Sequence, residues 1–553
     1  MPRFSIPSSK TKLWRGIFSG EDFGEIWSSR NIDLERNRGK IGLSDSYPEV
    51  FDSDDDAQLT NPIAFVRTDA DGTDRWWANA GRLFKTSGTN PESGWTEDAI
   101  ANTPTAPLYD MFDFEGDLWI PTSTNIDRNV GGTWTNDFWS SLSGASALTA
   151  NPHRFAILAG ALIFTDGRFV NDFDGTIARD PALTLPTGFR GEGIKTFGEI
   201  AFVFGAEIGG GESFVYTWDR ITTNYIARYP VGDTEVLCMF VKDSVYIVTK
   251  KGLIKRFNGT GFDTVQQFPT VEAQEEITSI HPNGVSVTEN IAKMIVNFGV
   301  ISNDRLASGI WNFDIDSRNL YHAGSPRNTT TRDYAQGELA NVGALKQTVV
   351  GQGLYLIGAQ TYTVYTGTTV HGIFTSAEAS TNNQGYFITS KLRAPNVQAF
   401  WRLIFAHLRN MTSADDRFRI AIRTSDSNEL PAYETITWAT ASTFTASNSD
   451  IAVGDFVEVL AGENAGAIAR ITDISAGTVT IDRSLFASTA AARVRYLRFT
   501  DLGTISNVQV VAEIFHATQR GTFLQMLIEF RGTRTSPLLE KLIIDRKDLP
   551  QIV

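Results

Sequence analysis

Short apolar runs of strand length, each preceded by a small or polar turn, recur along the first two thirds of the chain. β-branched and aromatic residues dominate each run, so each one predicts a hairpin with a buried second strand. The runs are FEGDLWIPTS (114–123), LAGALIFTDG (158–167), FGEIAFVFGA (197–206), VKDSVYIVTK (241–250) and VGQGLYLIGA (350–359). Leu118, Leu162, Ile200 and Val245 hold equivalent places in the first four, at a spacing of about 38 to 45 residues.

Several of these runs are followed by a second hairpin whose turn contains glycine. The examples are NVGGTWTNDF (129–138), RFVNDFDGTI (168–177) and KRFNGTGFDTV (255–265). Four strands in a unit of about 40 residues match one blade of a β-propeller, and weaker members near Ile63 and Met294 fill the longer gaps. We therefore predict an all-β chain with a propeller of about seven blades over residues 61–378. Six or eight blades, or an array of sandwiches, would give a similar pattern.

The pattern of apolar and polar positions changes after residue 380. Strands with alternating apolar positions lie in 388–410 and 417–427, and their partners return only near the C-terminus, which predicts a discontinuous β-sandwich of residues 379–435 with 495–548. Between the two pieces, residues 450–485 form a meander of short strands joined by Gly turns. That meander predicts a small SH3-like barrel, inserted as residues 440–494.

Residues 1–60 mix charges with sparse apolar positions and are predicted to be an irregular N-terminal segment. Asp52, Asp54, Asp55 and Asp56 cluster at its end. A solvated loop is the favoured interpretation of this cluster, and a cation site is the alternative.

Composition narrows the classes of function. With 49 basic and 63 acidic residues the net charge is −14, which argues against a surface that grips phosphates. The single cysteine, Cys238, lies in an apolar run and excludes an intrachain disulfide, so it is predicted to be a small buried hydrophobe. The chain shows neither a signal peptide nor an apolar run long enough to cross a membrane.

Catalytic motifs are missing from the sequence. The six histidines form no metal-binding pattern, and His407 and His516 sit in strand patterns. The glycines Gly209, Gly210 and Gly211 lack the lysine of a phosphate-binding loop. The densest basic stretch, TKKGLIKRF (249–257), is predicted to be a solvated strand edge rather than a nucleic-acid site. We predict no enzyme activity and no catalytic, cofactor-binding or metal-binding residue.

Two alternatives to this prediction rest on particular residues. Asp69, Asp71 and Asp74 resemble half of a calcium loop, although the sixth position lacks the required glycine. A propeller glycosidase or lectin would use aromatic platforms for sugars, and the candidates are Trp76, Trp77, Trp119, Trp134 and Trp139. Packing between blades is the favoured use of these tryptophans.

The layout resembles that of virion proteins of tailed bacteriophages, particularly tail nozzle and tail-hub components. The residues that carry the resemblance are the opening WSSRNIDLERNRGKIGLSD, the closing RYLRFTDLG with TSPLLEKLIID, and the inserted GDFVEVLAGENAGAIARITDI. The resemblance covers most of the chain in layout and short pieces in residues, and it transfers no functional residue.

The resemblance implies a non-enzymatic structural subunit of the virion tail, made and assembled in the host bacterial cytoplasm. It implies a homo-oligomeric ring, expected to be a hexamer, around the DNA exit channel. The implied partners are the portal or adaptor, other tail proteins and tail fibres, with genomic DNA passing without sequence-specific binding. The negative charge agrees, because like charge around a channel lets DNA slide without being held. The alternative is a carbohydrate-active or receptor-binding propeller.

Overall fold

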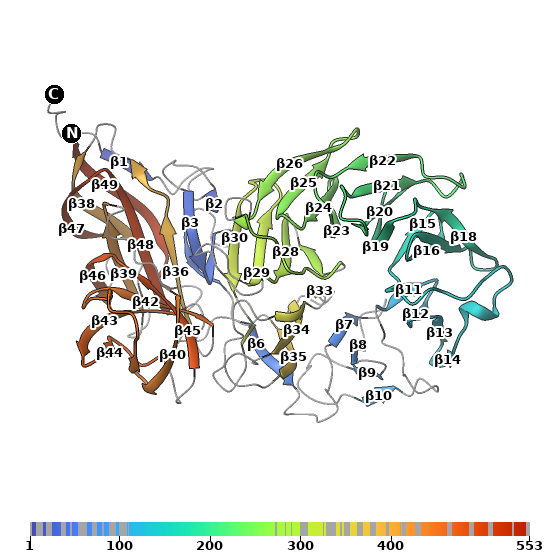
Figure 1. The fold of residues 1–553 in the computed structure, drawn as a ribbon, viewed down its shortest axis with the longest axis horizontal. Coiled ribbons are helices and arrows are strands. Elements are labelled where there is room, and N and C mark those ends of the chain that lie inside the picture. The colour runs from blue at the N-terminus through green and yellow to red at the C-terminus, as the bar shows by residue number, and fades with distance from the viewer. Residues whose placement is uncertain are drawn as a thin grey trace.

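The computed structural model of the chain is all-β, as the sequence predicts (Figure 1). Strands β1 to β49 and the short 3-10 turn η1 (Trp139–Ser141) are its named elements, and no helix in the described part is long and apolar enough to cross a membrane. The structure describes residues 3–6, 15–17, 25–34, 40–44, 47–52, 63–68, 74–79, 82–87, 96–98, 108, 110–270, 274–282, 284–288, 290–298, 308–324, 326–327, 339–342, 346–347, 354–361, 369–375, 383–393, 398–409, 411, 416–425, 433–461, 467–485, 491–506, 512–532 and 536–548.

Six consecutive antiparallel sheets of four strands occupy residues 63–324, each with its strands in chain order. The first three are β7 (Ile63–Thr68), β8 (Asp74–Asn79), β9 (Arg82–Ser87) and β10 (Thr96–Asp98); β11 (Phe112–Phe114), β12 (Asp117–Pro121), β13 (Ile126–Val130) and β14 (Thr133–Thr135); and β15 (Phe155–Leu158), β16 (Ala161–Asp166), β17 (Phe169–Phe173) and β18 (Ala178–Thr184). The next three are β19 (Phe189–Phe197), β20 (Ile200–Glu207), β21 (Phe214–Trp218) and β22 (Ala227–Pro230); β23 (Val236–Val241), β24 (Val245–Thr249), β25 (Leu253–Phe257) and β26 (Phe262–Gln267); and β27 (Val285–Thr288), β28 (Ile291–Val296), β29 (Gly309–Asp314) and β30 (Leu320–Gly324).

A seventh sheet combines strands from distant parts of the chain. Its order is β31-β6-β35-β34-β32, and β33 also pairs with β34. The bounds are β31 (Pro326–Arg327), β6 (Tyr47–Asp52), β35 (Thr369–Thr375), β34 (Leu354–Thr361), β32 (Leu339–Val342) and β33 (Lys346–Gln347). Strand β6 therefore carries the N-terminal segment into a sheet whose other strands lie about 300 residues later.

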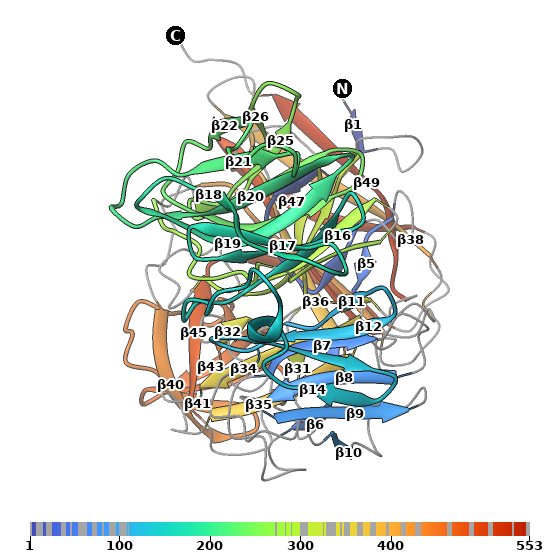
Figure 2. The same cartoon turned by 90° about the vertical axis from the view of Figure 1, so that its right-hand side faces the viewer.

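The seven sheets follow one another around a common centre in a propeller-like arrangement (Figure 1), and Figure 2 shows the second to fourth sheets from the end farthest from the barrel. Neighbouring first strands contact one another from β15 through β19 and β23 to β27, and β34 meets β7 where the circle closes. A separate apolar cluster fills each space between neighbouring sheets from the first to the fifth. Because both faces of a sheet are buried, its strands are apolar on both sides, which explains continuous runs such as fully buried β16.

The predicted hairpins are confirmed in register. Leu118, Leu162, Ile200 and Val245 all lie at the start of the second strand of their sheets. The second hairpins turn between the third and fourth strands, as in β25–β26, where the Asn258 side chain accepts hydrogen bonds from the backbone of Thr260 and Gly261. This is an Asx-type turn, which Asn and Gly favour.

Two further sheets contain the C-terminal residues. The first has the order β1-β49-β38-β47, with β1 (Arg3–Ile6), β49 (Leu539–Asp548), β38 (Ala399–Leu408) and β47 (Ala512–Gly521). The second has the order β2-β3-β36-β48-β39-β46, with β2 (Arg15–Ile17), β3 (Glu25–Arg30), β36 (Asn383–Thr389), β48 (Phe523–Gly532), β39 (Arg417–Arg423) and β46 (Thr500–Ser506), and β37 (Leu392–Arg393) also pairs with β48. We call these two sheets the C-terminal unit.

A closed barrel lies between β39 and β46 in the chain. Its order is β40-β41-β44-β43-β42-β45, with β40 (Tyr433–Thr440), β41 (Thr443–Thr445), β44 (Thr478–Ile481), β43 (Ile468–Ser475), β42 (Phe456–Ala461) and β45 (Ala491–Leu497). Val457, Val459, Ile471 and Val479 fill its interior, which agrees with the apolar positions of the predicted meander.

The first 60 residues differ from the irregular segment that the sequence predicts. They contain β1 to β6, including the hairpin β4 (Ile32–Asp33) with β5 (Gly42–Leu43). Among the described residues of this segment, that hairpin and the parallel pair β2–β3 are the local pairings; the other strand pairings are to β49, β36, β35 and β31. Short strands whose partners are remote in sequence leave a weak local pattern, which is why this region looked irregular.

Candidate functional site

The tryptophans considered as sugar platforms are mostly internal. Trp76, Trp119 and Trp139 are buried in the apolar clusters between the first, second and third sheets, which confirms packing as their use. Trp134 is half-buried against the cluster between the first two sheets. The side chain of Trp77 lies outside the described part of the structure.

The single thiol and the strand histidines also lie where the sequence placed them. Cys238 is fully buried between the fifth and sixth sheets, and burial raises the pKa of its thiol. His407 and His516 lie in β38 and β47, respectively.

The basic stretch 249–257 is not a sheet edge, so that prediction is wrong. Strand β25 lies between β24 and β26, and its basic side chains are engaged with neighbouring elements. The contacts are Lys250 Nζ to Glu235 at 3.3 Å, Arg256 Nη2 to Asp243 at 2.7 Å and Lys255 Nζ to the Val231 carbonyl at 2.6 Å. The stretch helps to hold the fourth and fifth sheets together.

The acidic candidates fall largely beyond the described residues. Asp54, Asp55, Asp56, Asp69 and Asp71 are outside them, as are the side chains of Asp52 and Asp74. Gly209 to Gly211 form the turn between β20 and β21. In the described ranges, no three His, Cys, Asp or Glu side chains are placed to hold a metal ion together.

One buried carboxyl has the perturbed pKa that an acid catalyst would need. Burial raises the pKa of Asp127 to about 6, a backbone hydrogen bond opposes the rise, and the charge of Asp137 adds to it. The Asp127 Oδ1 atom accepts a hydrogen bond of 2.7 Å from the Asp137 backbone N–H. The carboxyl therefore anchors the chain leading into η1, where Trp139 is buried.

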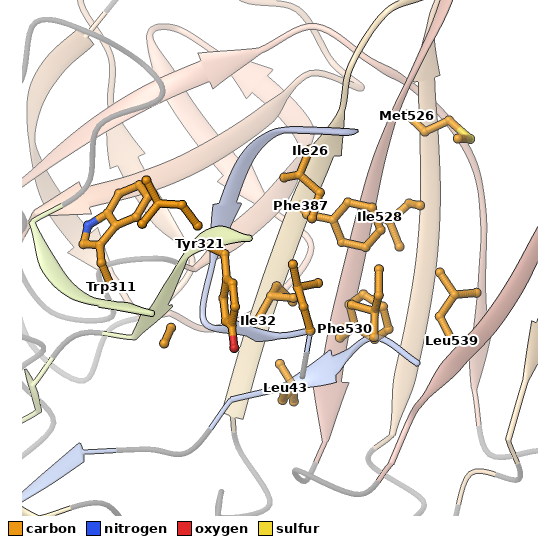
Figure 3. Packing of buried hydrophobic residues seen from close by; sticks show 14 of the residues in the cluster. Ile26, Ile32, Leu43, Trp311, Tyr321, Phe387, Met526, Ile528, Phe530 and Leu539 are labelled. Carbon is orange, nitrogen blue, oxygen red and sulfur yellow. The ribbon is translucent and has the colours of Figure 1, made fainter. Parts of the chain in front are cut away.

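The most unusual chemistry lies where the N-terminal segment meets the C-terminal unit, the barrel and the sixth sheet. One continuous apolar core runs from the fifth and sixth sheets through residues 26–34 and 41–43 into the C-terminal unit. Figure 3 shows Ile32 and Leu43 between Tyr321 on one side and Phe530 on the other. Residues 26–34 and 41–43 thus fill the joint between two units that would otherwise be separate.

Backbone contacts fix the position of this segment. Ile41 exchanges two backbone hydrogen bonds with Leu539, at 3.0 and 2.9 Å. Asn31 turns the chain with a positive φ of 54°, and its side-chain amide donates to the Gln384 carbonyl at 3.1 Å. Gly385 of β36 lies so close that a Cβ there would be 2.5 Å from the Asn31 carbonyl oxygen. Asparagine and glycine are the residues that such a turn and such an approach allow.

A buried ionic cluster, which we call the junction cluster, lies on the barrel side of this joint. It consists of Arg30 of β3, Tyr386 of β36, Glu458 of β42 and Arg495 of β45. The Glu458 carboxylate lies 3.2 Å from Arg30 Nε, forms a second ion pair with Arg495, and accepts a hydrogen bond from the Tyr386 hydroxyl. Arg30 and Glu458 are 0% exposed, so this ion pair has lost its hydration completely.

The electrostatics of the junction cluster follow from its burial. Burial raises the pKa of Glu458, while Arg30 and the Tyr386 hydrogen bond act in the opposite direction. Burial and the charge of Arg30 lower the pKa of Arg495 well below its usual range. Burial also lowers the pKa of His322 of β30 to about 3, and the charge of Arg30 contributes. Arg30 therefore acts electrostatically on both the barrel and the sixth sheet.

A second ionic cluster lies between the barrel and β39 and β48. The Glu529 carboxylate forms ion pairs with the guanidinium groups of three arginines, at nitrogen–oxygen distances of 3.4 Å to Arg419, 3.2 Å to Arg483 and 2.7 Å to Arg531. Arg419 forms a further ion pair of 2.6 Å with the Asp482 carboxylate. Burial lowers the pKa of Arg483 to about 9. Burial opposes the charged form of Arg419, but the charges of Glu529 and Asp482 outweigh it and raise its pKa.

Apolar residues cover the surface between these two clusters. Tyr386, Ile388 and Leu527 of the C-terminal unit pack with Phe456 and Ile468 of the barrel. The barrel is therefore fastened by a dry apolar patch with ion pairs on two sides, an arrangement suited to holding modules in one relative orientation.

Little in the sequence indicates the junction cluster. Glu458 and Arg495 stand in strands whose apolar neighbours alternate into the barrel, so both lie on its outer face. Arg30 lies in a segment predicted to be irregular. No local pattern could have shown that the three side chains converge, because Arg30 lies more than 400 residues before Glu458 and Arg495.

Comparisons with known proteins give only distant similarity. No family model matches the chain, and no curated protein matches it. Among solved structures, the computationally designed Ika8 protein aligns at 11% identity and a TM-score of 0.35, covering 56% of this chain and 96% of its own. The WD40 β-propeller domain of Doa1 aligns at 10% identity and a TM-score of 0.39, covering 60% of this chain and 97% of its own. YjhT aligns at 11% identity and a TM-score of 0.33, covering 47% of this chain and 97% of its own. Scores this low carry no functional argument.

Replacing Glu458 by Gln should destabilise the protein strongly, because Arg30 and Arg495 would stay buried without their carboxylate. Removing one partner of a buried pair costs about 3–5 kcal/mol. Urea unfolding monitored by fluorescence measures this loss. The exposed barrel residue Asp473 is the matched control, and Asp473→Asn should stay within about 0.5 kcal/mol of the wild type. An equal, small effect of both substitutions would contradict the assigned role of the cluster.

Replacing Gly385 by Ala should loosen the joint by about 1–3 kcal/mol, since the new Cβ must displace the backbone of Arg30 and Asn31. Gly261→Ala is the control, because a Cβ at Gly261 meets nothing within 4 Å. Limited proteolysis should cut the Gly385 variant faster within residues 25–44 and leave the Gly261 variant unchanged. Unaltered cleavage of both variants would show that the segment is not held there.

Replacing Asp127 by Asn should flatten the dependence of stability on pH. The pKa of Asp127 is raised to about 6 in the folded state, so the folded state binds the extra proton more tightly and wild-type stability falls as pH rises from about 4 to about 6. Two pKa units correspond to about 3 kcal/mol. We expect the free energy of unfolding of Asp127→Asn, measured by urea unfolding and compared with that of the wild type, to be higher at pH 7.5 than at pH 4.5. An identical difference at both pH values would refute the raised pKa.

Proposed function

We propose that the chain is a non-enzymatic structural subunit of a tailed-phage virion, in a tail nozzle or hub position. In this proposal the seven sheets are seven propeller blades, the last completed by β6, and the C-terminal unit is a β-sandwich carrying an SH3-like barrel. Copies form a ring, expected to be a hexamer, around the DNA exit channel. The ring docks the portal or adaptor, adjacent tail proteins and tail fibres.

The observation that carries the proposal is the fused joint around Arg30. A part that holds other proteins at set positions around a channel needs its own modules fixed relative to one another. One apolar core crosses from the sixth sheet into the C-terminal unit, and buried ion pairs fasten the barrel to that unit. A hinged pair of domains would have a small polar interface instead.

Charge gives a second line of support. Each copy carries a net charge of −14, so a ring of copies repels the phosphates of passing DNA. DNA could then move through the ring without being retained.

The alternative function is a carbohydrate-active or receptor-binding propeller. The raised pKa of Asp127 favours it, since a carboxyl with a pKa near 6 resembles the general acid of a glycosidase. Its Oδ1 atom, however, is already engaged with the Asp137 backbone.

Mass measurement of the purified chain tests the proposal. Mass photometry and negative-stain microscopy, alone and with candidate portal, adaptor and fibre proteins, should find closed rings or ring-containing complexes. A chain that stays monomeric with all of these partners and hydrolyses a glycan would establish the alternative, and Asp127→Asn would then abolish the hydrolysis.

A further inference from the structure

Exposed aliphatic side chains recur at one position in three consecutive sheets. The turn between the third and fourth strand of the second, third and fourth sheets presents Val130, Ile177, and Ile221 with Ile226, respectively. Their exposed fractions are 49%, 55%, 85% and 52%. The equivalent turn of the fifth sheet is the polar Asn258–Gly261. We call these four residues the rim arc; the sheets that carry it face the viewer in Figure 2.

Ion pairs hold part of the rim arc in shape. Asp172 accepts from Arg179 Nε and Arg220 Nε, both at 2.9 Å, and so ties the turn of the third sheet to that of the fourth. The carboxylates of Asp174 and Asp219 accept backbone hydrogen bonds within their own turns. The hydrogen bonds lower the pKa of both carboxyls, so they stay charged. These three carboxylates and the guanidiniums of Arg179 and Arg220 sum to a charge of −1.

Another exposed aliphatic residue, Ile514, lies at the end of the molecule opposite the rim arc. Strand β47 is the last strand of its sheet, pairing only with β38 in the described structure, and Ile514 on it is 47% exposed. The other outward residues of this strand are His516, Thr518 and Arg520, so its outward side chains include a guanidinium and no carboxylate. Figure 1 shows β47 and the strands of the rim arc at the two ends of the longest axis.

We propose that the rim arc of one copy docks on the β47 edge of the next copy. Copies with a charge of −14 repel each other, so contact is favourable only where apolar surface meets and local charges are complementary. The arc, with Asp174 and Asp219 in its turns, and the β47 strand with Arg520 meet both conditions. Two different patches on one chain make a head-to-tail contact, which closes into a ring when the rotation between copies allows. This inference rests on the proposed ring-forming function and names its contact surfaces.

Complementary variants test the contact. Ile177→Asp with Ile221→Asp removes the arc, Ile514→Asp removes the β47 patch, and Val453→Asp is the control at an exposed barrel residue. Circular dichroism and thermal melting should match the wild type in all of them, because the side chains are exposed. By sedimentation velocity, the wild type and the control should form the ring, and each of the other two variants should be monomeric.

Mixing the two monomeric variants gives the sharpest result. Each retains one intact patch, so an equal mixture should contain dimers and nothing larger. If the arc variant and the Ile514→Asp variant each still formed rings, the assignment of these two contact surfaces would be wrong, although the proposed ring would be supported. If only the arc variant lost assembly, the head-to-tail contact would be wrong, and a symmetric contact between the rim arcs of two copies would replace it. A wild-type chain that never assembles, even with tail partners, would remove the proposed function as well.

Discussion

The architecture depends on one buried carboxylate and the two guanidinium side chains that pair with it. Glu458 comes from the barrel, Arg495 from its neighbouring barrel strand, and Arg30 from the N-terminal segment. Removing such charges from water is costly, and the cost is offset only when all three side chains are in place. The apolar contacts around them would tolerate small shifts, whereas the ion pairs and the Tyr386 hydrogen bond do not. Hydrophobic burial thus supplies the attraction between the modules, and the ionic cluster selects one arrangement of them.

The N-terminal segment determines how the large units relate. Its strands enter both sheets of the C-terminal unit, cover β30 at the outer edge of the sixth sheet, and complete the seventh sheet. The propeller-like ring and the C-terminal unit therefore share one interior. This explains why β30 is buried along its whole length although it is the last strand of its sheet.

The sequence predicted what local patterns can encode. The hairpins with Leu118 and Leu162 were found because turn and strand signals are adjacent in the chain, and the barrel was found for the same reason. The role of Arg30 could not be found this way, since its partner is Glu458 and a single sequence does not show which distant strands pair. The basic stretch around Lys255 was misplaced for a related reason: its charge suggested a sheet edge, while the carbonyl of Val231, just after β22 of the fourth sheet, accepts a hydrogen bond from Lys255. The proposed place in a phage tail combines the resemblance in layout with two further observations, the fused joint around Arg30 and the negative charge.

The pairing of β3 with β36, and of β6 with β35, has a consequence for biosynthesis. Both early strands leave the ribosome hundreds of residues before the strands that pair with them. At typical elongation rates of about 5–20 residues per second, they wait for at least about 15 seconds without these partner strands. During that time two strands with open edges are available to pair with other chains, so the early part of the nascent chain is the part most exposed to misassembly.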